Sequence, residues 1–237
     1  LELTRLAVES EADYVKFQIY TGDSIVNPAV SPERNAHFKK FELSPGDHMQ
    51  LADFCHQHGK GYLASVWDID AFEWIDPYLE IYKIGSGDLT AFEFLKKIAK
   101  TGKPLIFSTG LATLQEIKEA IAYLCSQNPV YQDREKVAIL QCTSMYPIPF
   151  EDANLKVMQE IRQETGYVTG YSDHTEGIEA LETAYSMGAE VLEFHFTDSR
   201  EGKTFRDHKV SLTKEEVAQL TEKISRINAL KGTEIGR

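Results

Sequence analysis

A repeated alternation of short apolar runs and amphipathic stretches limits the folds open to this sequence more than any other feature. The pattern predicts seven strands and eight helices, beginning and ending on a helix. Strands that alternate with helices form a parallel sheet, because each helix carries the chain back to the starting edge. The predicted strands cover residues 13–20, 62–66, 80–84, 104–108, 137–142, 167–171 and 190–196. The predicted helices cover residues 1–11, 45–58, 71–78, 90–100, 113–126, 154–164, 178–187 and 213–230.

Capping signals mark several of the helix starts. Ser44 is a predicted N-cap, with Pro45 at the first helical position. Three other starts carry Thr with Glu three residues later, a capping box in which both side chains satisfy free backbone N–H groups. These pairs are Thr90 with Glu93, Thr113 with Glu116, and Thr213 with Glu216. Before Ser44 we expect a long loop, because the segment contains Asn27-Pro28 and Ser31-Pro32.

The fold class predicted from this pattern is α/β, in the form of a (β/α)₈ TIM barrel. Such a barrel has about 250 residues and eight strand–helix units, whereas this sequence has 237 residues and starts, without Met, inside a helix. We therefore expect the first barrel strand to lie before residue 1, and residues 1–237 to form one barrel domain. A doubly wound open sheet is the alternative. It usually has a Gly-rich turn after its first strand, and none follows Tyr20.

Charge and cysteine content limit the kinds of binding partner and the cellular location that we expect for this protein. The chain carries 25 Lys and Arg against 37 Asp and Glu, a net charge of −12, which argues against a nucleic acid or an anionic membrane surface. We find no apolar run long enough to span a bilayer and no signal peptide. Cys55, Cys125 and Cys142 match no metal or redox spacing, as expected for reduced thiols. We therefore expect a cytoplasmic protein.

Two histidines follow neighbouring predicted strands. Alternation along 190–196 separates Leu192, Phe194 and Phe196 from Val191, Glu193 and His195. The apolar face packs on helices, so we expect Glu193 and His195 to point into the barrel mouth. His174 ends the preceding strand, about 4.8 Å away, so the two imidazoles can converge on one ion. They suit Mn²⁺, Fe²⁺, Co²⁺ or Zn²⁺. The alternative is two unrelated histidines with satisfied hydrogen bonds.

Two lysines lie within predicted strands. Lys16 shares a face with Gln18, and Lys83 precedes Gly85-Ser86-Gly87. A lysine inside a barrel strand is costly unless it meets an anion, so the pair predicts a site for a phosphate or carboxylate. Hydroxyls at other strand ends, from Ser86, Ser108 and Ser144, add to it. The alternatives are a Schiff-base lysine, as in class I aldolases, and a lysine that extends to the rim.

These residues lie in six segments that resemble the sialic acid (N-acetylneuraminate) synthase family. The segments, in chain order, are ADYVKFQ (12–18), YKIGSGDL (82–89), STG (108–110), QCTSMYP (141–147), GYSDHT (170–175) and EFHFT (193–197). Members of this family condense phosphoenolpyruvate with an N-acylated amino sugar to give nonulosonic acids. Their catalytic domain is a (β/α)₈ barrel. The resemblance implies the same fold and reaction here.

The resemblance also implies roles for individual residues. His174 and His195 match the two metal-binding histidines, and the implied metal is Mn²⁺, with Mg²⁺ or Co²⁺ as alternatives. The positions that surround phosphoenolpyruvate match Lys16, Lys83, Ser86, Ser108, Ser144, Tyr146 and Ser172. The positions near the sugar match Gln18, Asp88, Tyr146 and Asp207. In the family such enzymes associate as homodimers.

The departures from the family pattern affect the identity of the sugar substrate more than the condensation reaction. We expect this chain to lack the family's first strand, with its Glu-x-Gly-x-Asn segment, and its C-terminal antifreeze-like domain. Ser144 replaces an Asn found in many members, as in the pseudaminic acid and spore-coat polysaccharide branches, and Asp88 replaces a Glu. A synthase acting on a sugar phosphate would need an extra basic site, for which we find no obvious candidate in the sequence.

The implied reaction assigns charge and proton roles to the predicted cluster. Lys16 and Lys83 hold phosphoenolpyruvate and offset its developing charge. Glu193 orients a ligand or relays a proton, and the metal acts as a Lewis acid on the sugar aldehyde. Two other functions stay open: a catalytically inactive barrel or binding protein, and a lysine Schiff-base aldolase.

Overall fold

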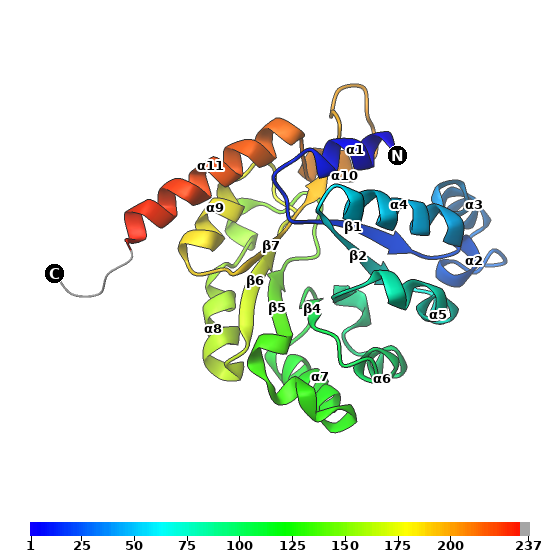
Figure 1. The fold of residues 1–237 in the computed structure, drawn as a ribbon, viewed down its shortest axis with the longest axis horizontal. Helices are drawn as coiled ribbons and strands as arrows, with labels where there is room; N and C mark the ends of the chain where they lie inside the picture. The colour runs from blue at the N-terminus through cyan, green and yellow to red at the C-terminus, as the bar shows by residue number, and fades with distance from the viewer. Residues whose placement is uncertain (233–237) are drawn as a thin grey trace.

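Seven parallel strands form one curled sheet at the centre of the computed structural model, which describes residues 1–232 (Figure 1). The strands are β1 (Tyr14–Ile19), β2 (Gly61–Val66), β3 (Tyr82–Ile84), β4 (Leu105–Ser108), β5 (Val137–Cys142), β6 (Val168–Ser172) and β7 (Val191–Glu193). They pair in chain order from β1 to β7, and every pair is parallel. A doubly wound sheet reverses its strand order at a switch point. The observed order therefore confirms the barrel class and excludes that alternative.

Helices cover the outer face of the sheet, as Figure 1 shows. They are α1 (Glu2–Val8), α4 (Pro45–Gln57), α5 (Phe72–Ile75), α6 (Phe92–Ala99), α7 (Leu114–Gln127), α8 (Lys156–Thr165), α9 (Glu179–Ser186) and α11 (Lys214–Lys231). Short 3₁₀ helices lie at η1 (Ile69–Ala71), η2 (Asp76–Tyr78), η3 (Ser86–Asp88), η4 (Pro129–Gln132), η5 (Arg134–Lys136) and η6 (Phe150–Asp152). Within residues 1–232, we find no helix that combines the length and the apolar character needed to cross a membrane.

The apolar core lies between the sheet and the helices and has two parts. The larger part packs β1–β5 against α4–α7, with Phe107 fully buried at its centre. The smaller part packs α8, α9 and α11 against β6 and the segment after it. Leu192, Phe194 and Phe196 belong to this second part, which confirms the apolar face predicted for them. Glu193 therefore points to the other side of its strand, into the barrel.

Most predicted helix starts are confirmed. Ser44 caps α4, and Thr113 and Thr213 form capping boxes with Glu three residues on. The capping box predicted at Thr90 is wrong, because α6 begins at Phe92 and has no side-chain cap. After η3 the chain makes a further turn, in which the Ala91 N–H donates to the Asp88 carbonyl, before it enters the helix.

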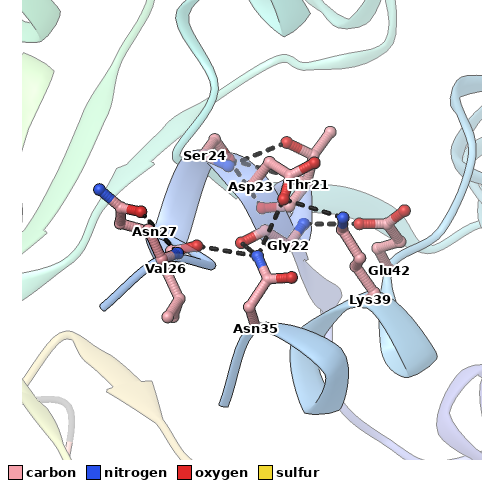
Figure 2. A network of polar contacts seen from close by, with 10 residues as sticks. Thr21, Gly22, Asp23, Ser24, Val26, Asn27, Asn35, Lys39 and Glu42 are labelled. Carbon is pink, nitrogen blue, oxygen red and sulfur yellow. Dashed lines mark hydrogen bonds and ion pairs between the residues drawn. The ribbon is translucent and has the colours of Figure 1, made fainter. Parts of the chain in front are cut away.

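The segment predicted as a long loop after β1 contains two helices, α2 (Gly22–Ile25) and α3 (Pro32–Phe41). Polar contacts, drawn in Figure 2, hold them together. The buried Asn35 amide donates to the carbonyls of Gly22 and Val26, at 3.0 and 2.8 Å, and the Gly22 N–H donates to Glu42 at 2.5 Å. An apolar pattern does not detect a helix that is held in this way, which explains the wrong prediction.

The strand predicted over 190–196 is broken. It leaves the main sheet after Glu193, and β8 (His195–Phe196) pairs instead with β9 (Ser211–Leu212), which follows α10 (Asp207–Val210). The Thr197 N–H donates to the Leu212 carbonyl at 2.9 Å. This short ladder fixes both ends of the segment 197–210 next to the barrel mouth.

The sheet has a closed part and an open part. Within residues 1–232, β1 and β7 each pair on one side only and do not pair with each other. We call this opening the seam, and the strands β2–β6 the wall. The helix layer crosses the seam, because α1 packs on α4 and the segment after it reaches α11 through Lys214 and Glu9, 2.7 Å apart. A further strand before residue 1 stays a prediction.

Candidate active site

A carboxylate between two lysines forms the centre of the site. Lys16 on β1 lies 2.9 Å from one Glu193 oxygen, and Lys83 on β3 lies 3.5 Å from the other. Lys83 also donates to the Ser108 hydroxyl at 2.7 Å, and Ser108 donates to Glu193 at 3.3 Å. Residues from β1, β3, β4 and β7 therefore meet inside the barrel, as the alternation of side chains predicts.

Burial sets the proton affinities in this cluster. Lys83 is only 4% exposed, and burial lowers its pKa to about 8 although Glu193 opposes the shift. Burial alone would raise the pKa of Glu193, but Lys16, Lys83 and a hydrogen bond from Ser172 hold it well below its usual range. Glu193 is therefore ionised at neutral pH. Two ammonium groups around one carboxylate leave a net positive charge, which suits a further anion.

Hydroxyl groups from neighbouring strand ends gather beside this cluster. The Gly110 N–H donates to the Ser86 hydroxyl at 2.9 Å. A Cβ atom at position 110 would overlap the hydroxyls of both Ser86 and Ser144. Close approach therefore favours glycine at this position, and it lets the two hydroxyls lie around one small space.

The two predicted histidines lie together. The rings of His174 and His195 are 5.2 Å apart, and the Tyr146 ring lies 4.0 Å from His174 and 5.7 Å from His195. Nδ1 of His174 lies 3.0 Å from the Thr143 carbonyl. A carbonyl can only accept, so Nδ1 carries the proton and Nε2 keeps its lone pair.

The histidine pair has the chemistry of metal ligands. Burial lowers the pKa of His174, and burial together with His174 lowers the pKa of His195 to about 4. Both rings are therefore neutral at pH 7, the form that binds metals. Asp207 Oδ2 lies 4.0 Å from His195 Nδ1. The described part of the chain holds no cluster of three or more His, Cys, Asp or Glu side chains arranged for a metal. A metal here would complete its shell with water or substrate.

The other predicted residues lie around this centre. Gln18 is exposed on β1, on the same face as Lys16. Asp88 lies in η3, where burial raises its pKa and the Trp67 indole is a hydrogen-bond partner. Ser172 is buried on β6 and hydrogen-bonds Glu193. Gln18 has no hydrogen bond or ion pair to the lysine cluster within residues 1–232.

Two residues near the histidines were not predicted. Asp173 is buried and accepts hydrogen bonds from the Thr175 N–H at 2.8 Å and the Tyr171 hydroxyl at 3.0 Å, which fixes the backbone at His174. Its place directly before His174 was a signal that the sequence offered. Arg206 lies with its guanidinium carbon 4.8 Å from the Tyr146 ring centre. The contact between Arg206 and Tyr146 joins two loops that are far apart in the sequence, and no sequence pattern predicts such a contact.

Comparisons with known proteins agree on one family. The model of the NeuB family matches residues 3–236. The N,N'-diacetyllegionaminic acid synthase of Campylobacter jejuni is 34% identical over 244 residues, covering 98% of this chain and 72% of that protein. The N-acetylneuraminate-9-phosphate synthase of Mus musculus is 30% identical, covering 98% and 66%. A solved N-acetylneuraminic acid synthetase of Leptospira borgpetersenii, in complex with citrate, is 27% identical with a TM-score of 0.88, covering 98% and 79%.

Proposed function

Because the chain belongs to the NeuB family, we propose that it condenses phosphoenolpyruvate with an N-acylated amino sugar. The products are a nonulosonic acid of the sialic type and inorganic phosphate. One observation carries the proposal: Lys16 and Lys83 converge on one carboxylate beside a hydroxyl-lined space, next to two neutral histidines. This arrangement suits a reaction in which an anionic substrate lies next to a carbonyl compound.

The anion subsite is suited to phosphoenolpyruvate. Lys16 and Lys83 supply two ammonium groups, of which Glu193 neutralises one charge. The hydroxyls at 86, 108, 144 and 172 surround the position, and the Gly110 N–H orients the Ser86 hydroxyl. A bound phosphate and carboxylate raise the proton affinity of Lys83 again, so both lysines bind phosphoenolpyruvate as cations.

His174 and His195 would hold the divalent metal, which we propose is Mn²⁺, with Mg²⁺ or Co²⁺ as alternatives. When bound, such an ion supplies Lewis-acid polarisation of the sugar aldehyde. The hydrogen bond from His174 Nδ1 to the Thr143 carbonyl keeps the ring in the orientation and tautomer that a metal needs. Tyr146, packed on His174, fixes the ring from its face.

Carbon 3 of phosphoenolpyruvate attacks the aldehyde carbon, and the aldehyde oxygen takes up a proton. Water adds at carbon 2, and the bond from carbon 2 to the phosphate oxygen breaks, so the keto oxygen comes from water. Lys16 and Lys83 offset the charge that develops on the phosphate. Glu193, which is ionised at neutral pH, accepts the proton of the attacking water. Gln18, Asp88 and Asp207 face the sugar in this proposal.

A Schiff-base aldolase is the second candidate, because the pKa of the buried Lys83 is lowered to about 8. A lysine with a lowered pKa is a better nucleophile toward a ketone. Borohydride added with pyruvate would trap the imine as a stable adduct on Lys83, visible by mass spectrometry. The synthase proposal predicts no adduct.

The test is turnover with phosphoenolpyruvate and a panel of N-acylated amino sugars, with Mn²⁺ present. The proposal predicts phosphate release only when both substrates are present. In H₂¹⁸O the label should enter the keto acid and not the phosphate. Lys83→Met should lower the rate of release about 10²- to 10³-fold, whereas Lys118→Met, at an exposed surface pair with Glu164, should keep it. Label in the phosphate, or equal activity of both variants, would contradict the proposal. A homodimer and a cytoplasmic location belong to the same proposal.

A further inference from the structure

Arg206 places a positive charge at the barrel mouth. Its guanidinium carbon lies 4.8 Å from the centre of the Tyr146 ring, and its side chain is 68% exposed. A guanidinium that stacks on an aromatic face keeps its N–H edge free for oxygen acceptors. Tyr146 itself packs against His174 and His195. Arg206 therefore lies one aromatic ring away from the histidine pair.

The charge of Arg206 is less satisfied than those of its neighbours. In the same segment, Arg200 lies 2.5 Å from Glu216, and Lys203 forms a close ion pair with Asp198. Arg206 Nε lies 3.5 Å from Asp207 Oδ1, too long for a good hydrogen bond. That oxygen is buried and accepts no hydrogen bond within residues 1–232. Arg206 thus leaves most of its N–H donors available to a ligand.

The backbone around Arg206 is held on both sides, despite the exposure of the side chain. Phe205 stacks on His37 of α3, with ring centres 5.7 Å apart. His208 Nδ1 lies 2.9 Å from the Thr197 hydroxyl, at the β8–β9 ladder. The structure thus positions Arg206 between a contact to α3 and a contact to the base of the segment.

We propose that Arg206 is a specificity-determining residue that binds an oxygen substituent of the acceptor sugar. This inference rests on the proposed function. The phosphoenolpyruvate subsite is built around Glu193 by Lys16, Lys83 and Ser108, and no hydrogen bond or ion pair within residues 1–232 joins Arg206 to that cluster. Arg206 lies instead on the side of Tyr146, the histidines and Asp207, which is left for the sugar.

The chemistry shared by the possible ligands is an oxygen acceptor on a sugar substituent. A phosphate can accept two hydrogen bonds from the planar guanidinium group and carries the opposite charge. A carbonyl or hydroxyl oxygen can accept a hydrogen bond from the same group but is uncharged. Because the one ion pair that Arg206 forms within residues 1–232 is the long contact to Asp207, a phosphorylated acceptor should gain the most. The residue is thus a basic group of the kind that a sugar phosphate requires.

The experiment measures KM for both substrates with N-acetylmannosamine and with its 6-phosphate. Arg206→Ala should raise KM for the preferred sugar roughly 10- to 100-fold, with KM for phosphoenolpyruvate unchanged. Arg206→Lys keeps the charge without the planar fork, and should recover part of the loss. Lys209→Ala removes an exposed charge from α10 without touching Tyr146 and is the matched control. Calorimetric titration of phosphoenolpyruvate shows that each variant keeps the anion subsite.

The outcomes separate the two proposals. A preference for the phosphorylated sugar that disappears in Arg206→Ala supports a phosphate ligand. A selective rise in KM for the neutral sugar supports recognition of a carbonyl or hydroxyl. An unchanged KM for both sugars, or an equal effect from Lys209→Ala, overturns the role of Arg206 without contradicting the proposed function. A wild-type chain that binds no phosphoenolpyruvate contradicts the proposed function, and this inference with it.

Discussion

The wall and the seam of the barrel each contribute one lysine to the same carboxylate, but in different environments. Lys83 lies on β3 of the wall, between two paired strands, and is 4% exposed. Lys16 lies on β1 at the seam, where the strand pairs on one side only, and its side chain is 30% exposed. Lys83 is therefore positioned by the packing around it, whereas Lys16 is positioned mainly by its ion pair with Glu193.

This difference shows how an incompletely paired barrel can still present a defined site. Glu193 on β7 and Lys16 on β1 lie 2.9 Å apart although their strands do not pair. The ion pair thus joins the two edges where the backbone ladder does not. The same charges that bind the proposed anion also position β1 and β7 relative to each other.

Replacing the wall lysine should have the largest effect on activity. Lys83→Met removes the buried ammonium and should lower kcat/KM about 10²- to 10³-fold. The free energy of unfolding should change by less than about 1 kcal/mol, because Glu193 keeps Lys16 as a partner and the cost of burying a charge disappears. Steady-state kinetics and urea unfolding measure the two effects. A large loss of stability would mean that the wall depends on this ion pair.

Removing the shared carboxylate should have the largest effect on stability. Glu193→Ala leaves two lysines facing each other and should lower the free energy of unfolding by about 3 kcal/mol at pH 7. The pKa of Glu193 is held below its ordinary value of 4.5. Its contribution is therefore present above pH 4.5 and is lost as the pH falls toward the folded-state pKa. Glu164→Ala, at an exposed pair, should cost under about 1 kcal/mol; equal costs would contradict the account.

The pH dependence of anion binding should report the wall lysine. In the free protein the pKa of Lys83 is about 8, below the ordinary 10.5, so the folded state disfavours the ammonium form. Phosphoenolpyruvate needs that form, and its affinity should fall as the pH rises above about 8. In Lys83→Arg the charge persists at every pH in this range, so the fall should disappear. Calorimetric titration of phosphoenolpyruvate between pH 7 and 10 measures the affinity. A parallel fall in the wild type and in Lys83→Arg would mean that a group other than Lys83 titrates.

Replacing the seam lysine should affect stability as little as replacing the wall lysine, and should affect function less. Lys16→Met should change the free energy of unfolding by under about 1 kcal/mol, because the ion pair is partly exposed. The affinity for phosphoenolpyruvate should still fall about tenfold, since one of two cations is lost. Urea unfolding and calorimetry test both values. A loss of stability as large as that of Glu193→Ala would mean that the seam depends on Lys16 alone.

The sequence predicts the parts of this molecule that depend on apolar periodicity. The strands, the barrel class and the inward direction of Lys16, Lys83 and Glu193 follow from alternation along parallel strands, whereas the ion pairs that join these three side chains were not predicted. The helices α2 and α3 could not be predicted, because Asn35 and Glu42 hold them through polar contacts. The break after Glu193 depends on pairing with β9, and the place of Arg206 depends on Tyr146 in a different loop. Such contacts between distant segments leave no periodic pattern.

Titration of phosphoenolpyruvate into the wild-type chain and Lys83→Met, with Mn²⁺ and then with EDTA, tests whether the wall and seam lysines together form one anion site beside the histidines. We predict saturable binding at one site in the wild type, weaker binding with EDTA, and much weaker binding in Lys83→Met. Equal binding by both proteins, or none by a wild-type chain that is folded by circular dichroism, would contradict it.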